Sequence, residues 1–188
     1  MTFDKKSSTG PAPIFWFTGL SGVGKSTLAR AFVACLREQG LTPLLLDGDA
    51  LRDALEPVDD RRCHDQDARE RRAWRIARLA RLAAEQGVPV VVATISLFHS
   101  VQRWSRNSAV PYAEVWLRAD MKILRERKPE LYGSIGHPGL TDVVGRDLVA
   151  EFPLQAEMVI DQTFERKGLD LQLISLMTLW QRFSWRSA

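Results

Sequence analysis

The feature that constrains this chain most is a short glycine-rich motif near its N-terminus. Residues 19–26 read GLSGVGKS and fit the pattern G-x-x-x-x-G-K-[ST]. The apolar run IFWFT at 14–18 precedes the motif and is typical of a buried strand, and residues 26–39 follow with apolar positions at helical spacing. A strand, a glycine turn and a helix start in this order aim backbone N–H groups at an anion. The motif therefore predicts a phosphate-binding loop.

The residue types in this loop predict separate roles. The glycines let the backbone curl, Lys25 would place a cation on the β- and γ-phosphates of a nucleoside triphosphate, and the Ser26 hydroxyl would bind Mg²⁺. We therefore expect ATP and Mg²⁺ as cofactors. The predicted ATP-binding residues are Gly19, Leu20, Ser21, Gly22, Val23, Gly24, Lys25, Ser26 and Thr27.

The rest of the chain alternates between strand and helix patterns. Further strands are expected at 43–46, 88–95, 113–117 and 158–160, and helices at 50–55, 69–86, 101–107, 121–127 and 169–183. Alternation of this kind predicts an α/β fold, the P-loop NTPase fold, with a parallel sheet between layers of helices. We expect a flexible tail at 1–13, one domain at 14–188, and a mobile loop or lid at 132–149.

Composition narrows the classes of protein. The chain has 188 residues, two cysteines without a CxxC partner and three scattered histidines, which argues against a disulfide framework or a zinc site. No apolar run is long enough to span a membrane, and the polar N-terminus does not resemble a signal peptide, so we expect a cytoplasmic protein. A net charge of +3 without interleaved aromatic residues does not favour nucleic acid as a partner.

A second motif follows the strand at 43–46. Asp47, Gly48 and Asp49 stand at the strand end, and Arg52 follows three residues after Asp49. Either aspartate could organise Mg²⁺ or accept the proton of an attacking hydroxyl, and Arg52 could pair with an anionic acceptor. The alternative is that the aspartates cap the next helix, for which one of them is enough. No Asn-Lys-x-Asp motif for guanine is present, and the strand at 88–95 ends without an acid, so a kinase is favoured over a GTPase or a motor ATPase.

Taken together, these motifs resemble the adenylyl-sulfate kinase (APS kinase) family. The resemblance rests on FTGLSGVGKSTLAR at 17–30, LLDGDALR at 45–52, RKPELY at 127–132 and the segment 143–161. It implies transfer of the ATP γ-phosphate to the ribose 3′-hydroxyl of a small-molecule nucleotide acceptor, and a homodimer.

The resemblance also assigns residues. It implies catalytic roles for Lys25, Asp47, Asp49 and the lid arginine Arg127, and Mg²⁺ contacts from Ser26 and Asp47. The acceptor would lie against Asp49, Arg52, Arg69, Arg72, Arg75, Ser96, Leu97, Phe98 and Lys128.

The departures from the family pattern gather on the acceptor side. Ala68 and Arg72 stand where the family has an acid and an asparagine, and Leu97-Phe98-His99 stand where it has Pro-Tyr-Arg. The sequence is therefore similar to a divergent branch that includes a cytidine diphosphoramidate kinase of polysaccharide or capsule modification. An alternative of another class is a nucleotide-binding regulator without turnover. The intact Lys25, Ser26, Asp47 and Asp49 argue against it.

Overall fold

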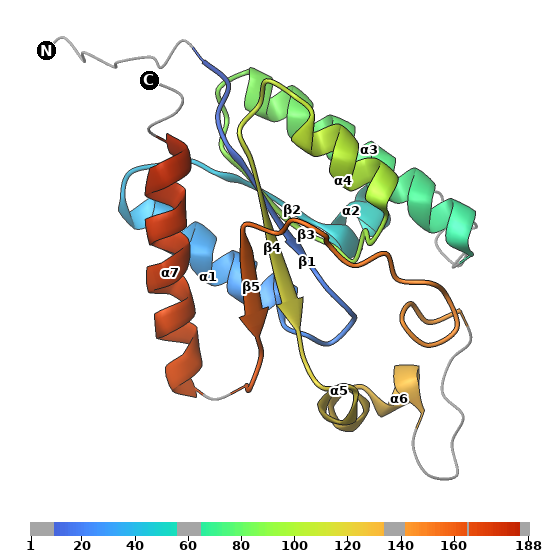
Figure 1. Cartoon of the computed structure of the whole chain (residues 1–188). Coiled ribbons are helices and arrows are strands. Elements are labelled where there is room, and N and C mark those ends of the chain that lie inside the picture. The colour runs from blue at the N-terminus through green and yellow to red at the C-terminus, as the bar shows by residue number, and fades with distance from the viewer. Residues whose placement is uncertain (1–9, 56–64, 134–141, 165, 185–188) are drawn as a thin grey trace, which may run out of the picture.

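The computed structural model describes residues 10–55, 65–133, 142–164 and 166–184 (Figure 1). Five strands, β1 (Ile14–Thr18), β2 (Leu44–Asp47), β3 (Val90–Ala93), β4 (Tyr112–Arg118) and β5 (Met158–Asp161), form one parallel sheet in the order β2-β3-β1-β4-β5. The predicted α/β fold with a parallel sheet is confirmed.

Helices cover both faces of this sheet. The helices are α1 (Lys25–Glu38), α2 (Gly48–Leu55), α3 (Gln66–Glu85), α4 (His99–Arg106), α5 (Met121–Arg127), α6 (Pro129–Tyr132) and α7 (Arg166–Ser184). The α1 and α7 helices pack on one face, and α3 and α4 pack on the other (Figure 1). The short α2, α5 and α6 helices lie near the ends of the strands.

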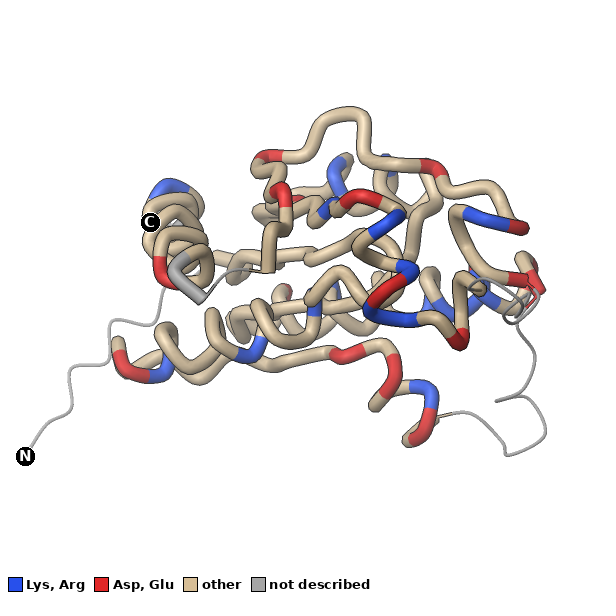
Figure 2. The backbone as a smooth tube through the Cα atoms, turned by 90° about the horizontal axis from the view of Figure 1, so that it is seen from below, with Lys and Arg blue, Asp and Glu red and all other residues tan. Residues whose placement is uncertain are grey.

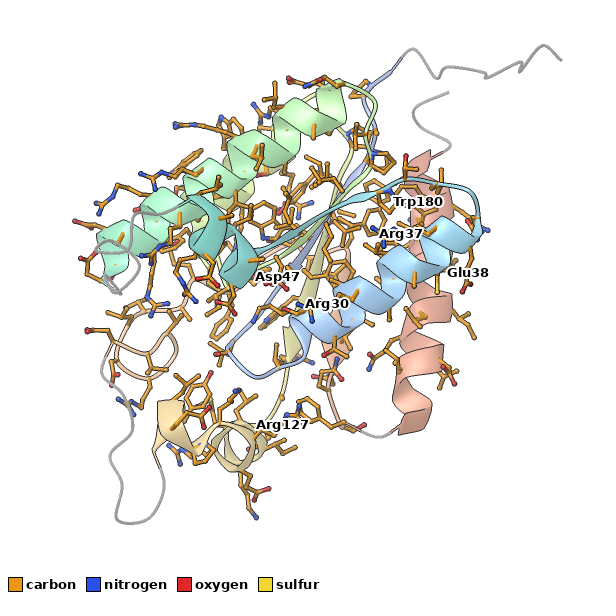
Figure 3. The ribbon with its side chains drawn as sticks, turned by 180° about the vertical axis from the view of Figure 1, so that it is seen from behind. Arg30, Arg37, Glu38, Asp47, Arg127 and Trp180 are labelled. Carbon is orange, nitrogen blue, oxygen red and sulfur yellow. The ribbon has the colours of Figure 1, made fainter. Side chains whose placement is uncertain are left out.

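The central strand β1 divides the core between the two faces. Because successive side chains of a strand point to opposite faces, Phe15 and Phe17 face α1 and α7, whereas Ile14 and Trp16 face α3. Phe15 packs on Trp180 of α7 with ring centroids 5.4 Å apart (Figure 3). Both faces of the strand are buried, which explains why its sequence is apolar without alternation.

The observed boundaries differ from the predicted ones where a side chain caps a helix or the chain leaves the sheet. Helix α3 begins at Gln66, earlier than expected, because Asp65 accepts the backbone N–H of Ala68 at 2.7 Å. Strand β3 ends at Ala93 rather than at 95, and beyond it Ile95 is joined to β1 through a side chain, because its carbonyl accepts from the Thr18 hydroxyl.

The expected lid at 132–149 is only partly described. Residues 134–141 lie outside the described residues, as does most of the predicted N-terminal tail. The end of the lid segment is packed: Val143 and Val144 are buried in the core beside the phosphate loop. Among the described helices, none is both long and apolar enough to cross a membrane. Figure 2 shows basic and acidic positions interspersed over the described chain.

Candidate active site

A cavity of about 590 Å³ opens at the carboxyl ends of the strands, where ligands bind in open α/β sheets. Its wall comes from the phosphate loop, the β2–α2 junction, α3, the β3–α4 segment, the α5–α6 junction and the segment after residue 142. The predicted site residues in this wall are Ser21, Gly22, Gly24, Lys25, Ser26, Thr27, Asp47, Asp49, Arg52, Arg69, Arg72, Ser96, Leu97, Phe98, Arg127 and Lys128.

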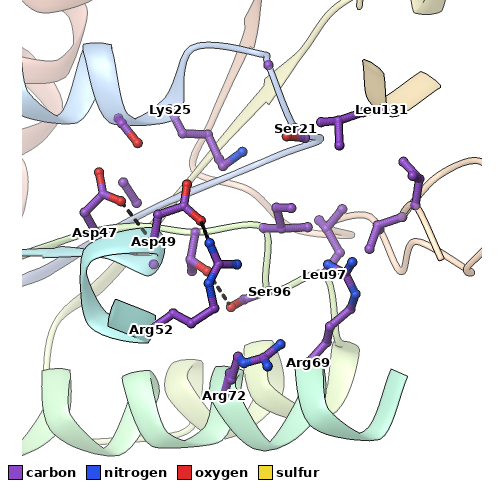
Figure 4. A pocket seen from close by; sticks show the side chains of 18 of the residues that line it. Ser21, Lys25, Asp47, Asp49, Arg52, Arg69, Arg72, Ser96, Leu97 and Leu131 are labelled. Atoms are coloured by element: carbon purple, nitrogen blue, oxygen red, sulfur yellow. Dashed lines mark hydrogen bonds and ion pairs between the residues drawn. The ribbon is translucent and has the colours of Figure 1, made fainter. Parts of the chain in front are cut away.

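The phosphate loop presents Lys25 to this cavity (Figure 4). Gly24, with φ of 95°, precedes α1, so the helix starts at Lys25 and turns its N-terminus toward the cavity. The Lys25 ammonium donates to the carbonyl of Leu20 at 2.9 Å. Burial lowers the pKa of Lys25 to about 8, although Asp49 and Asp47 oppose this shift. A half-buried ammonium in the wall of this cavity, beside the N-terminus of α1, can bind a polyanion.

Three predicted members of the loop lie behind the cavity wall. The side chains of Leu20 and Val23 are buried in the core. Gly19, with φ of +142°, is so close to β4 that a Cβ there would lie 2.1 Å from the carbonyl oxygen of Leu117. These three residues therefore make structural contacts that fix the loop against the sheet.

The two aspartates have different surroundings. Asp47 is 8% exposed, and its carboxylate accepts the backbone N–H of Asp49 at 3.1 Å and pairs with Arg30 at 3.2 Å (Figure 3). Asp47 therefore caps α2, which is the alternative raised by the sequence. The side chain of Asp49 is 81% exposed and pairs with Arg52 at 2.7 Å (Figure 4). Asp49 is thus the more accessible of the two carboxylates.

Steric crowding explains why the residue between the two aspartates is a glycine. A Cβ on Gly48 would lie 2.9 Å from the Thr94 hydroxyl oxygen and 3.5 Å from the Ala93 carbonyl oxygen. Only glycine lets β2 and β3 approach so closely where both strands end, and this approach brings the aspartates beside the β3–α4 segment.

Helix α3 contributes two of its three predicted arginines. Arg69 and Arg72 line the cavity (Figure 4), and Arg69 donates to the Asp142 carbonyl at 3.0 Å. Arg75 is exposed and is not part of the wall, so the structure does not bring it to the site. The spacing on the helix explains this result, because the exposed face that carries Arg71, Arg75 and Arg78 is turned away from the sheet.

The β3–α4 segment forms the apolar part of the wall. Leu97 is 2% exposed. It lines this part of the cavity together with Phe98, Val143, Val144 and Leu148. Ser96 adopts φ of 25°, an uncommon conformation for a residue other than glycine, and its hydroxyl lies 3.1 Å from that of Thr94. The cavity thus has a charged part beside Lys25 and an apolar part that suits a nucleotide base.

The predicted lid arginine, Arg127, lies beside the phosphate loop. The guanidinium of Arg127 lies 3.8 Å from the ring centroid of Phe164, and its Nε donates to the Gly22 carbonyl at 3.3 Å. It therefore joins the phosphate loop to the segment that follows β5. Lys128 pairs with Glu130 at 3.2 Å and packs against Gly22.

Sequence reasoning missed Arg30, Thr94 and Phe164. Thr94 was missed because the strand at 88–95 was expected to continue past it. Phe164 lies shortly after the end of β5, just as Asp49 lies shortly after the end of β2. Because the ends of parallel strands meet at one edge of the sheet, this position could have been predicted to lie near the site. Arg30 is the last residue of the motif at 17–30 but was given no role, and only the fold brings α1 beside Asp47.

The residues present fit a magnesium ion. The Ser26 hydroxyl and the carboxylates of Asp47 and Asp49 line the same cavity as Lys25. Oxygen donors of these types are those that Mg²⁺ prefers.

Comparison with known proteins places this geometry in a family. Residues 12–161 match the family described as Adenylylsulphate kinase. An adenylyl-sulfate kinase of Bacillus pumilus is 38% identical over 151 residues, which cover 79% of this chain and 75% of that protein. A cytidine diphosphoramidate kinase of Campylobacter jejuni is 32% identical over 151 residues, which cover 80% of this chain and 86% of that protein.

A solved structure agrees with these relatives. The Mycobacterium tuberculosis APS kinase in complex with AMPPNP and APS aligns with a TM-score of 0.78 at 25% identity, over 92% of this chain and 99% of that one. The chain therefore belongs to the adenylylsulphate kinase family and is an ATP-dependent phosphotransferase that acts on a hydroxyl group.

Proposed function

We propose that this kinase transfers the γ-phosphate of ATP to the ribose 3′-hydroxyl of a nucleotide that carries a modified 5′ group. The observation that carries the proposal is that Lys25 and Asp49 line one cavity, in which the carboxylate of Asp47 is held by its own contacts. Lys25 stabilises the charge of the transferring phosphoryl group. Asp49 accepts the proton of the acceptor hydroxyl.

The neighbours of Asp49 support this role. The ion pair with Arg52, at 2.7 Å, orients its carboxylate. Asp47 fixes the first turn of α2, which places Asp49. Mg²⁺, which would be held by Ser26 and Asp47, would neutralise phosphate charge when bound.

The acceptor would occupy the remainder of the cavity. Its anionic groups would face Arg52, Arg69 and Arg72, and its base would lie on Leu97 and Phe98. Lys128 would contact the acceptor from the α5–α6 junction. Arg127 would act on the ATP side, since it contacts Gly22 and Phe164.

The experiment measures ADP release from ATP and Mg²⁺ with adenylyl sulfate and with cytidine diphosphoramidate as acceptors. We expect turnover with one of them, with the new phosphate on the 3′-oxygen, which ³¹P–¹H coupling identifies. Asp49→Asn should lower kcat by about 10²–10⁴-fold, the usual contribution of a general base, with little change in ATP affinity. Asp53→Asn, at an exposed position of the same helix, is the matched control.

Two other outcomes are informative. Turnover only with cytidine diphosphoramidate would favour a cytidine diphosphoramidate kinase. The Campylobacter relative supports this candidate, as does Arg72, which stands where the family has an asparagine. ATP binding without ADP release for either acceptor would contradict the proposal and favour a regulator without turnover. A homodimer, which the family resemblance predicts, and a location in the cytoplasm, which the sequence predicts, belong to the same proposal. Light scattering would measure the mass of the assembly.

A further inference from the structure

The α4 helix, which follows residues 96–98 of the cavity wall, is capped by a distant segment. Phe98 stands at the N-cap position, and its side chain has no oxygen that could accept a backbone N–H. The carboxylate of Glu151 takes this role, because its Oε2 accepts the backbone N–H of His99 in the first turn. A negative charge is also favoured at this end of a helix. The start of α4 therefore depends on a side chain that comes 52 residues later in the chain.

Further hydrogen bonds join the same two segments. The Glu151 N–H donates to the Leu97 carbonyl at 3.2 Å, and the Glu151 carbonyl accepts from the Gln102 side chain at 3.2 Å. The His99 Nε2 donates to the Phe152 carbonyl at 2.9 Å. Gln102 is buried, so its bond to Glu151 is shielded from water. Residues 151–152 are thus fastened to residues 97–102 along the start of α4.

The two joined segments both lead into the apolar part of the cavity. Leu97 and Phe98 line it from one segment, and residues 143, 144, 148 and 149, all valine or leucine, line it from the other. Ser96 has φ of 25°, and a residue other than glycine keeps such a conformation only where its surroundings hold it. Figure 4 shows Ser96 and Leu97 at this wall. Glu151 itself is not among the described residues of the wall, so it acts on the wall through the residues that it joins.

We propose that Glu151 is a positioning residue for the acceptor. Its carboxylate holds the β3–α4 segment at a fixed separation from residues 143–149, and this separation shapes the apolar part of the cavity. The inference rests on the proposed function, because that function assigns the apolar part to the base of the acceptor. The contacts of Glu151 named above lie on the acceptor side. Loss of the carboxylate should therefore weaken acceptor binding and leave the ATP site as it is.

Steady-state kinetics of Glu151→Ala and Glu151→Gln test this role. ADP release is measured with ATP, Mg²⁺ and whichever of adenylyl sulfate and cytidine diphosphoramidate the parent protein phosphorylates. Glu151→Ala should raise the KM for the acceptor about tenfold, which corresponds to about 1.4 kcal/mol and lies within the usual cost of losing an N-cap. The kcat and the KM for ATP should change by less than about twofold. Glutamine keeps an oxygen for the His99 N–H, so Glu151→Gln should recover most of the loss.

Two control variants separate this effect from a general loss of structure. Arg103→Ala removes an exposed side chain from α4, and Glu38→Ala removes an exposed carboxylate from α1. Both should leave the KM for the acceptor unchanged. Thermal unfolding shows whether each variant is folded. If Glu151→Ala is unfolded, Gln102→Ala takes its place, because it removes another contact with Glu151 and should raise the same KM.

Hydrogen exchange gives a readout that requires no acceptor. In the complex with AMPPNP and Mg²⁺, Glu151→Ala should speed amide exchange in residues 97–102 about tenfold, because the start of α4 loses its cap. Exchange in residues 19–27, which form the phosphate loop, should stay as in the parent protein. Glu151→Gln should give an intermediate rate in residues 97–102.

Three kinetic results would overturn the inference: an unchanged KM for the acceptor, an equal loss in kcat or in the KM for ATP, or a Glu151→Gln variant as impaired as Glu151→Ala. A parent protein that releases no ADP with either acceptor would contradict the proposed function instead. The exchange comparison then decides on Glu151. Faster exchange confined to residues 97–102 would support its positioning role, and unchanged exchange there would refute it.

Discussion

Glu114 is a buried carboxylate that is not part of the cavity wall, and its replacement by glutamine tests the electrostatic reasoning. The side chain lies on β4 and is 1% exposed. Its Oε2 accepts from Arg106 at 3.3 Å, and its Oε1 lies 3.5 Å from the Tyr112 hydroxyl. Glu157, which also pairs with Arg106, adds a second negative charge.

Burial raises the pKa of Glu114 from 4.5 to about 7, with Arg106 opposing the shift and Glu157 adding to it. Between these values the unfolded chain has lost the proton and the folded chain keeps it, so stability must fall as the pH rises. Within this range the free energy of unfolding falls by about 1.4 kcal/mol for each pH unit. Between pH 4.5 and about pH 7 the parent protein therefore loses roughly 3 kcal/mol of its free energy of unfolding. Glu114→Gln avoids this loss because glutamine does not titrate.

Urea unfolding followed by tryptophan fluorescence at several pH values between 5 and 8 measures this effect. The free energy of unfolding of Glu114→Gln, minus that of the parent protein, should rise with pH and level off above pH 7. Glu85→Gln, at an exposed position of α3, is the surface control. A difference that is constant with pH, or that falls as the pH rises, would refute the reasoning.

Three other substitutions test the geometry of the site. Gly19→Ala should lower the melting temperature strongly, because the new Cβ would lie 2.1 Å from a backbone oxygen of β4, whereas Gly168→Ala, with its nearest neighbour at 3.7 Å, should not. Lys25→Ala should weaken ATP binding in calorimetry about tenfold to a hundredfold and leave the melting temperature unchanged or higher, since it removes a buried charge. Asp47→Asn should change urea stability by less than about 1 kcal/mol, because Arg30 is 67% exposed and the amide oxygen can still cap α2.

The sequence predicted the parts of the site that depend on local patterns. A glycine loop between an apolar run and a helix has few alternative structures, and strands that end at one edge of a parallel sheet bring their next residues together. For this reason Asp47 and Ser96, which come from different strands, are predictable neighbours of the phosphate loop. Both line the cavity together with Lys25.

The features that the sequence did not predict depend on the rotation of a helix about its axis and on long-range packing. Arg72 and Arg75 are separated by about one helical turn, yet only Arg72 faces the cavity, because the burial of Ala73, Ile76 and Ala77 fixes the rotation of α3. Glu114 interrupts an apolar strand and shows no partner in the sequence. The arginine that pairs with it comes from α4, and the fold alone brings them together.

If the proposed function holds, the strand order separates the residues for ATP from those for the acceptor on the two sides of β1. Arg127 and Phe164, beside the phosphate loop, follow elements on the β4 and β5 side, whereas Asp49, Arg69 and Arg72 follow from the β2 and β3 side. Under this proposal, substitutions in α2, α3 and the β3–α4 segment would change which molecule is phosphorylated and leave the ATP-binding residues unaltered. A lineage with this architecture would then acquire new substrates through a few replacements on one flank of the sheet.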